Sequence, residues 1–421
     1  MAVETDAVGQ ASVPPDRRPP ARGGRFRRLA LFGPAFVAAV AYVDPGNVAA
    51  NVTAGAQYGF LLLWVLVLAN LMAMLVQYLS AKLGIVTGKS LPELLGERLS
   101  RPARLAFWAQ AEIVAAATDL AEVIGGAIAL QLLFGVPLVI GGLIIGAASI
   151  ALLGMQRRGQ RRFEFAVMAL LAVIAVGFVA GACASHTHWG AFADGLVPRF
   201  RGGDTVLLGA SMIGATVMPH AVYLHSALAR DRHRDDKSAP HRRALLAANR
   251  VDVVSALTIA GVVNVAMLVL AADALSGVRG ADTIPGAHSA IVQTLGPVIG
   301  AAFAIGLLAS GLASTSVGSY AGAVVMGGLL KVRVPLLVRR LVTLIPAIVL
   351  LALGVDPTWA LVISQVVLSL GIPFAIVPLL RLTGSREVMG ADVDSRRTRI
   401  VGWVVAAAII VLNVVLVVLA F

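Results

Sequence analysis

Charged side chains are scarce in this sequence: they make up 13% of its 421 residues, whereas a soluble globular protein carries about a quarter. Hydrophobic residues make up 58%, which excludes an ordinary soluble domain and indicates a membrane protein. Cysteine occurs once, at Cys183, so an internal disulfide and a cluster of several thiolate metal ligands are both excluded. The zinc-protease pattern H-E-x-x-H is also missing, and we expect no enzymatic activity.

Apolar windows follow one another along the chain, each long enough for a helix that crosses a membrane, which takes about 20 residues. The eleven windows lie at residues 29–56, 58–86, 104–134, 136–155, 163–184, 205–229, 251–272, 288–330, 335–354, 358–380 and 399–420. The eighth is too long for one span, and we expect it to be tilted or to lie partly outside the bilayer. The sequence therefore predicts an all-α polytopic membrane protein with about eleven transmembrane helices.

Positive charge is distributed unevenly between the connections of these windows. Of the 34 Lys and Arg, 31 fall in six regions that an eleven-span path places on one side of the membrane. Only Arg199, Arg201 and Arg279 fall on the other side. Because Lys and Arg accumulate in cytoplasmic loops, we expect a cell-membrane protein with a cytoplasmic N-terminus and an extracellular C-terminus. The net charge of +12 then belongs to these loops, which argues against a nucleic-acid partner.

The first window is interrupted by Asp44-Pro45-Gly46-Asn47. A carboxylate is costly to desolvate inside a membrane, proline removes a backbone donor, and glycine relaxes the helix further. Such a break is tolerated at membrane depth only where it lines a protein-enclosed cavity or a water path. We therefore expect Pro45 and Gly46 to break the helix and to place Asp44 at a buried site.

The sixth window carries a second interruption, from Ala215 to His220, where Pro219 again breaks an apolar helix at mid-depth. Each break opens a set of five windows, and because five is odd the second set crosses the membrane in the opposite sense. Paired breaks of this kind point to the binding site of an inverted-repeat transporter. We expect a LeuT-like inverted repeat of helices 1–5 and 6–10, with discontinuous helices 1 and 6.

The same pattern predicts the domain organisation. Residues 1–28 mix Pro, Gly and Arg without periodicity, which is typical of a disordered cytoplasmic tail, and we expect no cleavable signal peptide. The remaining parts are the first five-helix repeat (29–184), an extracellular loop (185–204), the second, inverted repeat (205–381), and a cytoplasmic loop with the eleventh transmembrane helix (382–421).

Three stretches together resemble the Nramp family of divalent metal ion transporters. They are Asp44-Pro45-Gly46-Asn47 in the first window, Met218-Pro219-His220 in the sixth, and the run from Glu112 to Glu122 in the third. The likeness extends over about residues 28–380, nearly the whole membrane region. The resemblance implies transport of Mn²⁺ and Fe²⁺, with the ion as substrate and without a bound cofactor.

Five residues are candidate ligands of the metal ion. Asp44 offers an anionic oxygen, Asn47 an amide oxygen one turn later, and Met218 a thioether, from which Ca²⁺ and Mg²⁺ gain little. The resemblance adds the backbone carbonyl of Ala215 and the side chain of Gln365. Two alternatives stay open: Asn47 only caps the second half-helix, and Met218 only packs in the core.

Acidic residues of the third window suggest a proton route. Its candidate members are Asp44, Glu112, Asp119, Glu122, His220, Arg339 and Arg340. The three acids of this window are spaced i, i+7 and i+10 on one helix face, and with Asp44 they are the acids that we place deep within windows. Acids in a line inside a membrane are typical of proton relays, histidine titrates near neutral pH, and the resemblance assigns the two arginines to receive or gate the proton. The alternatives are that the arginines only anchor the helix at the membrane surface and that the histidine only bonds across helices.

The sequence thus predicts a proton-coupled secondary transporter that imports Mn²⁺ or Fe²⁺ by alternating access. The alternative is a voltage-driven uniporter or channel-like pathway without obligatory proton coupling. A potential of 100 mV supplies a divalent ion with roughly 4.6 kcal/mol, so proton coupling is not thermodynamically required. The expected partners are the metal ions, protons and membrane lipid, with no obligate protein partner.

Overall fold

The computed structural model describes residues 34–157, 160–232, 239–332, 334 and 336–420, and the regular structure of these residues is all helical. The first half contains α2 (Pro34–Ala41), α3 (Pro45–Tyr58), α4 (Leu63–Thr87), α5 (Leu91–Arg98), α6 (Arg101–Phe134), α7 (Leu138–Arg157), α8 (Gln160–Ala184) and α9 (Trp189–Asp194). The second half contains α10 (Gly203–Thr216), α11 (Pro219–Arg232), α12 (Ala239–Ala274), α13 (Ile284–Leu295), α14 (Pro297–Leu330), α15 (Leu336–Ala352) and α16 (Pro357–Thr383). The short α17 (Arg386–Met389), the 3-10 turn η1 (Gly390–Asp392) and α18 (Arg396–Ala420) complete it. The predicted tail, residues 1–28, lies outside the described residues.

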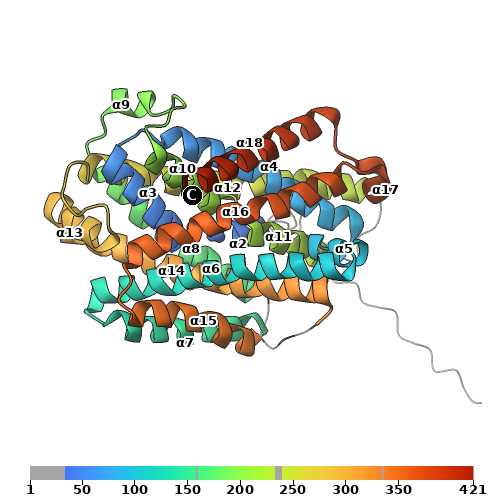
Figure 1. The fold of residues 1–421 in the computed structure, drawn as a ribbon, viewed down its shortest axis with the longest axis horizontal. Helices are drawn as coiled ribbons and strands as arrows, with labels where there is room; N and C mark the ends of the chain where they lie inside the picture. Colours follow the sequence, from blue (N-terminus) through green and yellow to red (C-terminus); the bar gives the residue numbers. More distant parts are fainter. Residues whose placement is uncertain (1–33, 158–159, 233–238, 333, 335, 421) are drawn as a thin grey trace, which may run out of the picture.

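The helices form one bundle in which α6, α14 and α16 run along the long axis (Figure 1). Within the described residues, seven helical segments are long and apolar enough to cross a membrane, and α7 and α8 add two shorter apolar stretches. The prediction of an all-helical membrane protein with several spans is confirmed. Each of the eleven predicted windows coincides with one helix or with a broken pair of helices.

The eighth window, which we expected to be too long for one span, consists of two helices. It is divided into α13 and α14 by Gly296, whose φ of 93° lies in the left-handed region, and Pro297 starts the second helix. Glycine accepts this conformation without steric cost, and proline at the first helical position forgoes only a hydrogen bond that the helix does not need. The sequence signal for this division was therefore present in the Gly-Pro pair.

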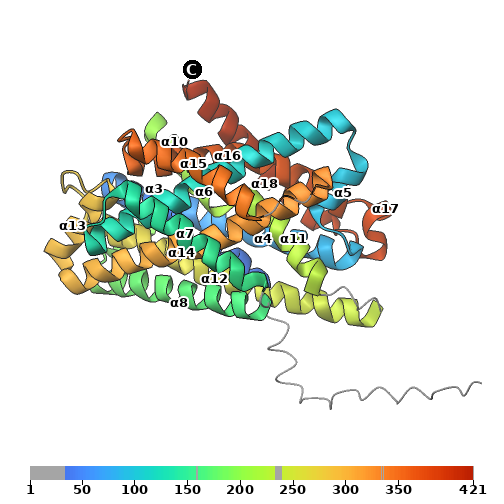
Figure 2. The ribbon, with the colours of Figure 1, turned by 90° about the horizontal axis from the view of Figure 1, so that it is seen from below.

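The two halves of the chain make corresponding contacts, as an inverted repeat requires. In the first half α3 packs on α12 of the second, and in return α11 packs on α4. Helices α6 and α14, each the third of its five-helix set, pack on each other. The short connecting helices α5 and α13, which occupy equivalent places in the two halves, lie at opposite ends of the bundle (Figures 1 and 2).

The short helix α5 is held on two sides by different kinds of contact. On one side Gly96 lies against the carbonyl of Gly328 in α14, so closely that a Cβ on either glycine would collide with the other helix. On the other side Glu93 forms an ion pair with Arg230 of α11. The backbone N–H of the first residue of α5 also donates to Ser226 Oγ of α11, at 2.9 Å. Helix α5 therefore bridges α14, through backbone packing, and α11, through polar contacts.

The segment after α16 is anchored by ion pairs and by a reciprocal amide contact. The ion pairs are Lys82–Asp394 at 2.6 Å, Arg242–Asp392 at 2.7 Å and Arg98–Glu387 at 3.5 Å. Asn413 of α18 accepts a hydrogen bond from Ser369 Oγ and donates one to the Ser369 carbonyl, each at 2.8 Å. The last helix is thereby fixed to α16.

Candidate functional site

The first break separates α2 from α3 and is organised by Asp44. This residue has extended backbone angles (φ −71°, ψ 166°) and is the N-cap of α3, with its Oδ1 accepting a hydrogen bond from the Asn47 backbone N–H at 2.9 Å. Pro45 occupies the first helical position, where a missing N–H costs nothing. The alternative that Asn47 caps the second half-helix is wrong, because Asp44 fills that position.

The second break separates α10 from α11 and exposes a backbone carbonyl. In a continuous helix the Ala215 carbonyl would accept from the N–H four residues later, but that residue is Pro219, which has none. Val217 leaves the helical region (φ −108°, ψ 66°), so the chain turns before α11 begins. The Ala215 carbonyl is thus available to a partner from outside its own helix.

The two breaks meet through the Asn47 side chain. Its Nδ2 lies 2.8 Å from the Ala215 carbonyl, 2.9 Å from the Tyr42 carbonyl and 3.1 Å from Asp44 Oδ1. From α16, Gln365 Nε2 donates to Asp44 Oδ2 at 3.2 Å. Asp44, Asn47, Ala215 and Gln365 are all fully buried. Four of the five candidate ligands therefore form one hydrogen-bonded cluster.

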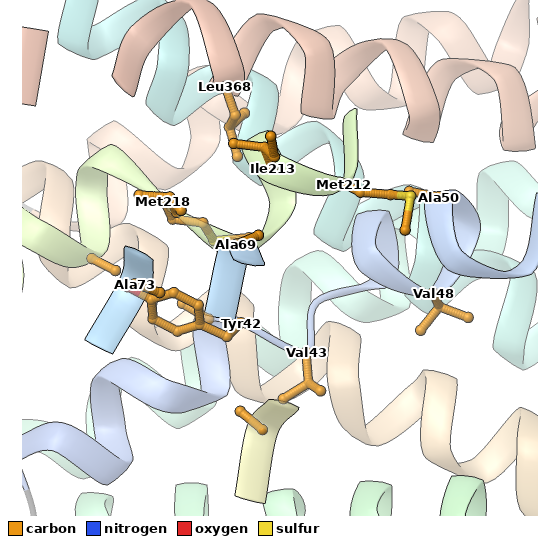
Figure 3. Close-up of a cluster of buried hydrophobic side chains, with 14 of the residues drawn as sticks. Tyr42, Val43, Val48, Ala50, Ala69, Ala73, Met212, Ile213, Met218 and Leu368 are labelled. Carbon is orange, nitrogen blue, oxygen red and sulfur yellow. The ribbon is translucent and has the colours of Figure 1, made fainter. Parts of the chain in front are cut away.

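Met218, the fifth candidate, is also fully buried and lies in the non-helical turn of the second break. Figure 3 shows it in one cluster of buried side chains with Tyr42 and Val43 of the first break and Ala69 and Ala73 of α4. The thioether is therefore at the junction of the two breaks, within an apolar lining.

Two amide oxygens at this junction have no hydrogen-bond partner among the described residues, Asn47 Oδ1 and Gln365 Oε1. A buried polar atom without a partner is uncommon and costs free energy, so these acceptors suit a ligand that offers positive charge. No group of three His, Cys, Asp or Glu side chains in the described ranges could hold a metal ion. Any cation site here would consist of one carboxylate with neutral donors.

The acids of α6 face arginines of α15. Glu112 Oε1 lies 2.9 Å from Arg339 Nη2, and Asp119 Oδ1 lies 3.0 Å from Arg340 Nη1. Glu112 is partly exposed, whereas Asp119 and both arginines are buried. The ion pairs therefore follow one another along one face of α6, from the surface inwards.

Glu122 and His220 occupy the inner end of this line. Glu122 is fully buried, and neither carboxylate oxygen has a hydrogen-bond partner in the described part of the chain. It lies near enough to Asp119 and Asp44 for their charges to interact. His220 Nδ1 is 3.3 Å from Thr118 Oγ1, the hydroxyl of the residue before Asp119. The acids of α6 are thus close to the first break.

Sequence reasoning missed several buried polar residues. His225 Nδ1 lies 2.8 Å from Gln77 Oε1, and the Gln77 amide nitrogen is hydrogen-bonded to the Tyr42 hydroxyl. Asn264 of α12 donates to the Tyr42 carbonyl at 2.9 Å. Their signal was available, since each is a polar residue within an apolar window.

One further acid is buried in the protein although it lies at the edge of its apolar window and not deep within it. Asp252 of α12 is buried, and its Oδ2 accepts a hydrogen bond from the Ala35 backbone N–H of α2 at 3.2 Å. An N–H in the first turn of a helix lacks an intrahelical partner, which explains why a carboxylate lies there.

Solved structures define the class of protein. A manganese transporter of Eremococcus coleocola, in complex with an aromatic bis-isothiourea compound, is 34% identical with a TM-score of 0.84, covering 94% of this chain and 87% of that one. A transporter of the nucleobase-cation-symport-1 family is 13% identical with a TM-score of 0.58, over 92% of this chain and 91% of that chain, and shares the fold alone. The fold is the expected LeuT-like arrangement, that of a multi-pass membrane transporter and not of an enzyme.

Sequence relatives define the family. The profile "Natural resistance-associated macrophage protein-like" (Nramp) matches residues 35–419. The divalent metal cation transporter MntH of Mycobacterium tuberculosis strain H37Rv is 62% identical over 388 residues, 92% of this chain and 91% of the relative. MntH of Bacillus subtilis strain 168 is 45% identical over 400 residues, 94% of each chain. The protein belongs to the Nramp family, as the resemblance of its three motifs indicated.

Proposed function

We propose that the protein imports divalent transition-metal ions, Mn²⁺ or Fe²⁺, across the cell membrane together with protons, by alternating access. The observation that carries this proposal is the convergence of the Asp44 carboxylate, the Asn47 amide and the Ala215 carbonyl from two broken helices. The names of the relatives, divalent metal cation transporter and manganese transporter, support the same substrate class.

The metal ion would take the place that the Asn47 amide nitrogen now occupies among three oxygens. Asp44 supplies the negative charge that a desolvated cation needs, and the Ala215 carbonyl supplies a neutral oxygen. The partnerless Asn47 Oδ1 and Gln365 Oε1 offer two further oxygens. Such a set has one charge and several neutral donors, which holds a divalent ion without trapping it.

Met218 would provide selectivity. A thioether is a soft ligand that transition metals accept and that Ca²⁺ and Mg²⁺ do not favour. Its burial at the junction of the breaks means that a hard ion would have to exchange hydration water for sulfur there. That exchange disfavours the abundant hard cations.

The protons would follow the acids of α6. Asp119 and Glu122 lie between the first break and the Arg339–Glu112 pair, and each buried acid or ion pair is within the reach of the next group. Buried ionisable groups in a membrane protein are expensive to maintain and commonly mark ion or proton paths. Asp44 and His220 are proposed as the members of this path nearest the metal ion.

We also propose the membrane orientation from the charge pattern. With 31 of 34 Lys and Arg on one side, the N-terminus would be cytoplasmic and the C-terminus extracellular. The division into a tail, two repeats with a loop between them, and an eleventh helix stays part of this proposal.

Transport by proteoliposomes with the membrane potential held at zero separates coupled transport from the uniporter alternative. If transport is coupled, an inward proton gradient should then drive Mn²⁺ accumulation and acidify the lumen. A uniporter would accumulate no Mn²⁺ under these conditions, because only the metal gradient itself would drive it. Accumulation that ignores the proton gradient would leave voltage-driven uniport as the function.

The Asp119→Asn variant tests the proposed proton path. Removing the negative charge opposite Arg340 should lower proton uptake by roughly tenfold and Mn²⁺ uptake by less, because an ion pair is lost while the metal ligands stay in place. Glu97→Gln, which breaks an exposed ion pair with Lys89, is the matched control. Equal loss of both fluxes in Asp119→Asn would argue against a separate proton path.

A further inference from the structure

Helix α7 carries a buried hydroxyl that none of the roles above uses. Between Leu138 and Leu152 its only polar side chain is Ser149, which is fully buried. The Ser149 hydroxyl donates to the Gly146 carbonyl at 2.7 Å and accepts a hydrogen bond from Arg340 Nε of α15 at 2.8 Å. Because its single hydrogen is committed to Gly146, the oxygen lone pairs are directed to Arg340.

The packing of α7 on α15 sets this contact. Residues of the two helices pair in antiparallel register: Gly142 faces Ile348, Gly146 faces Leu344, and Ser149 faces Arg340. A Cβ at Gly142 would lie 2.8 Å from Ile348 Cδ1, and one at Gly146 would lie 2.7 Å from Leu344 Cδ2. The glycines let the helices approach so closely that a short serine side chain reaches the guanidinium.

The orientation of the Arg340 guanidinium depends on a small number of contacts. It is the largest of the fully buried side chains in the described part of the chain, and arginine keeps its charge at any physiological pH. The guanidinium meets Asp119 Oδ1 at 3.0 Å and Ser149 Oγ, and the carboxyl group of Glu122 in α6 lies within electrostatic reach of it. A buried cation with so few contacts is oriented by each of them.

We propose that Ser149 is a positioning residue of the proton route: it keeps Arg340 aimed at Asp119 while Asp119 carries a proton. This rests on the proposed proton coupling. A proton on Asp119 removes the charge that attracts Arg340, whereas the bond from Nε to Ser149 Oγ is unaffected. The guanidinium therefore stays opposite the acid and is already in place when the proton moves on to the next group.

The test compares Ser149→Ala with Ser149→Thr, which restores the hydroxyl, in reconstituted full-length protein. Proton and Mn²⁺ uptake are measured on the same vesicles. Ser149→Ala should lower the ratio of proton to Mn²⁺ uptake by roughly tenfold, the effect of losing one hydrogen bond to a charged group. Ser149→Thr should return the ratio toward that of the wild type.

Ser289→Ala is the matched control, since the Ser289 hydroxyl of α13 also donates to a carbonyl of its own helix, and among the described residues no hydrogen bond joins it to an arginine. The inference is overturned if Ser149→Ala keeps the wild-type ratio, as Ser289→Ala should, or if a Ser149→Thr variant with an unchanged melting temperature fails to restore it. Should the wild type itself carry no protons, the proposed coupling and this role fall together. If the wild type carries them and Asp119→Asn loses them, an unchanged Ser149→Ala rejects only this role.

Discussion

The two breaks at the centre of the molecule occupy equivalent places in the two repeats but carry opposite kinds of group. The first break holds the charge: Asp44 caps α3 and accepts bonds from Asn47 and Gln365. The second break is uncharged and offers a carbonyl, freed by Pro219, and a thioether. In the proposed mechanism, the first break therefore attracts the cation and the second determines which cation binds.

Helix α16 contacts both breaks at the same residue, but in different ways. A Cβ on Gly46 of the first break would collide with the Gln365 side chain. A Cβ on Gly214, just before the second break, would collide with the Gln365 backbone carbonyl and lie 2.8 Å from the Ser369 nitrogen. The first contact can yield by side-chain rotation, whereas the second requires helices to separate.

The largest effect is expected at the charge of the first break. Asp44→Ala should reduce Mn²⁺ uptake by at least roughly a hundredfold, because a desolvated divalent ion loses its only anionic ligand. Asp44→Ser separates this from folding, since serine still caps α3 without providing charge. Uptake and Mn²⁺ binding by calorimetry would be measured, and transport retained by a folded Asp44→Ser protein would refute the site.

An intermediate effect is expected where the breaks meet α16. Gly214→Ala should destabilise the protein by about 2 kcal/mol, the usual cost of overpacking against backbone, and lower its melting temperature in detergent. Gly46→Ala should leave that temperature nearly unchanged but displace Gln365 and weaken Mn²⁺ affinity several-fold. Gly190→Ala, whose new methyl meets open space, serves as the control for both. If Gly46→Ala melted at a lower temperature than Gly214→Ala, the proposed difference between a yielding side-chain contact and a rigid backbone contact would be contradicted.

The smallest effect on flux is expected at the second break. Met218→Ala should keep Mn²⁺ uptake within roughly tenfold of the wild type, because the oxygen ligands persist, but should allow Ca²⁺ and Mg²⁺ to compete. Mn²⁺ uptake in liposomes is measured with each hard ion in excess. If these ions still fail to inhibit, the thioether does not determine selectivity.

Local sequence was sufficient to predict the helices and the position of both breaks. Apolar length gave the eleven windows, and Pro45 and Pro219 interrupted two of them at residues where the structure indeed ends one helix and begins another. The excess length of the eighth window was recognised, but its division at Gly296 and Pro297 was not predicted, because the length of the apolar run was given more weight than this pair.

Contacts between distant helices were harder to predict. Asp44 takes the capping position because its backbone is extended, whereas the sequence had suggested only Asn47 as a possible cap. Nothing local indicates that Arg340 faces Asp119 and Ser149, or that Asp252 meets the start of α2, since these pairs depend on helix register across the bundle. Which helix faces which, and at what depth, is set by packing of the whole fold.

The two-sided attachment of α5 determines how that end of the protein can come apart. Its glycine contact with α14 brings backbone against backbone, so closely that a Cβ on either glycine would collide with the other helix. Arg230 and Glu93, by contrast, are partly accessible, and solvent can replace their bond with little loss of free energy. The interface between α5 and α11 therefore separates more easily than the interface between α5 and α14.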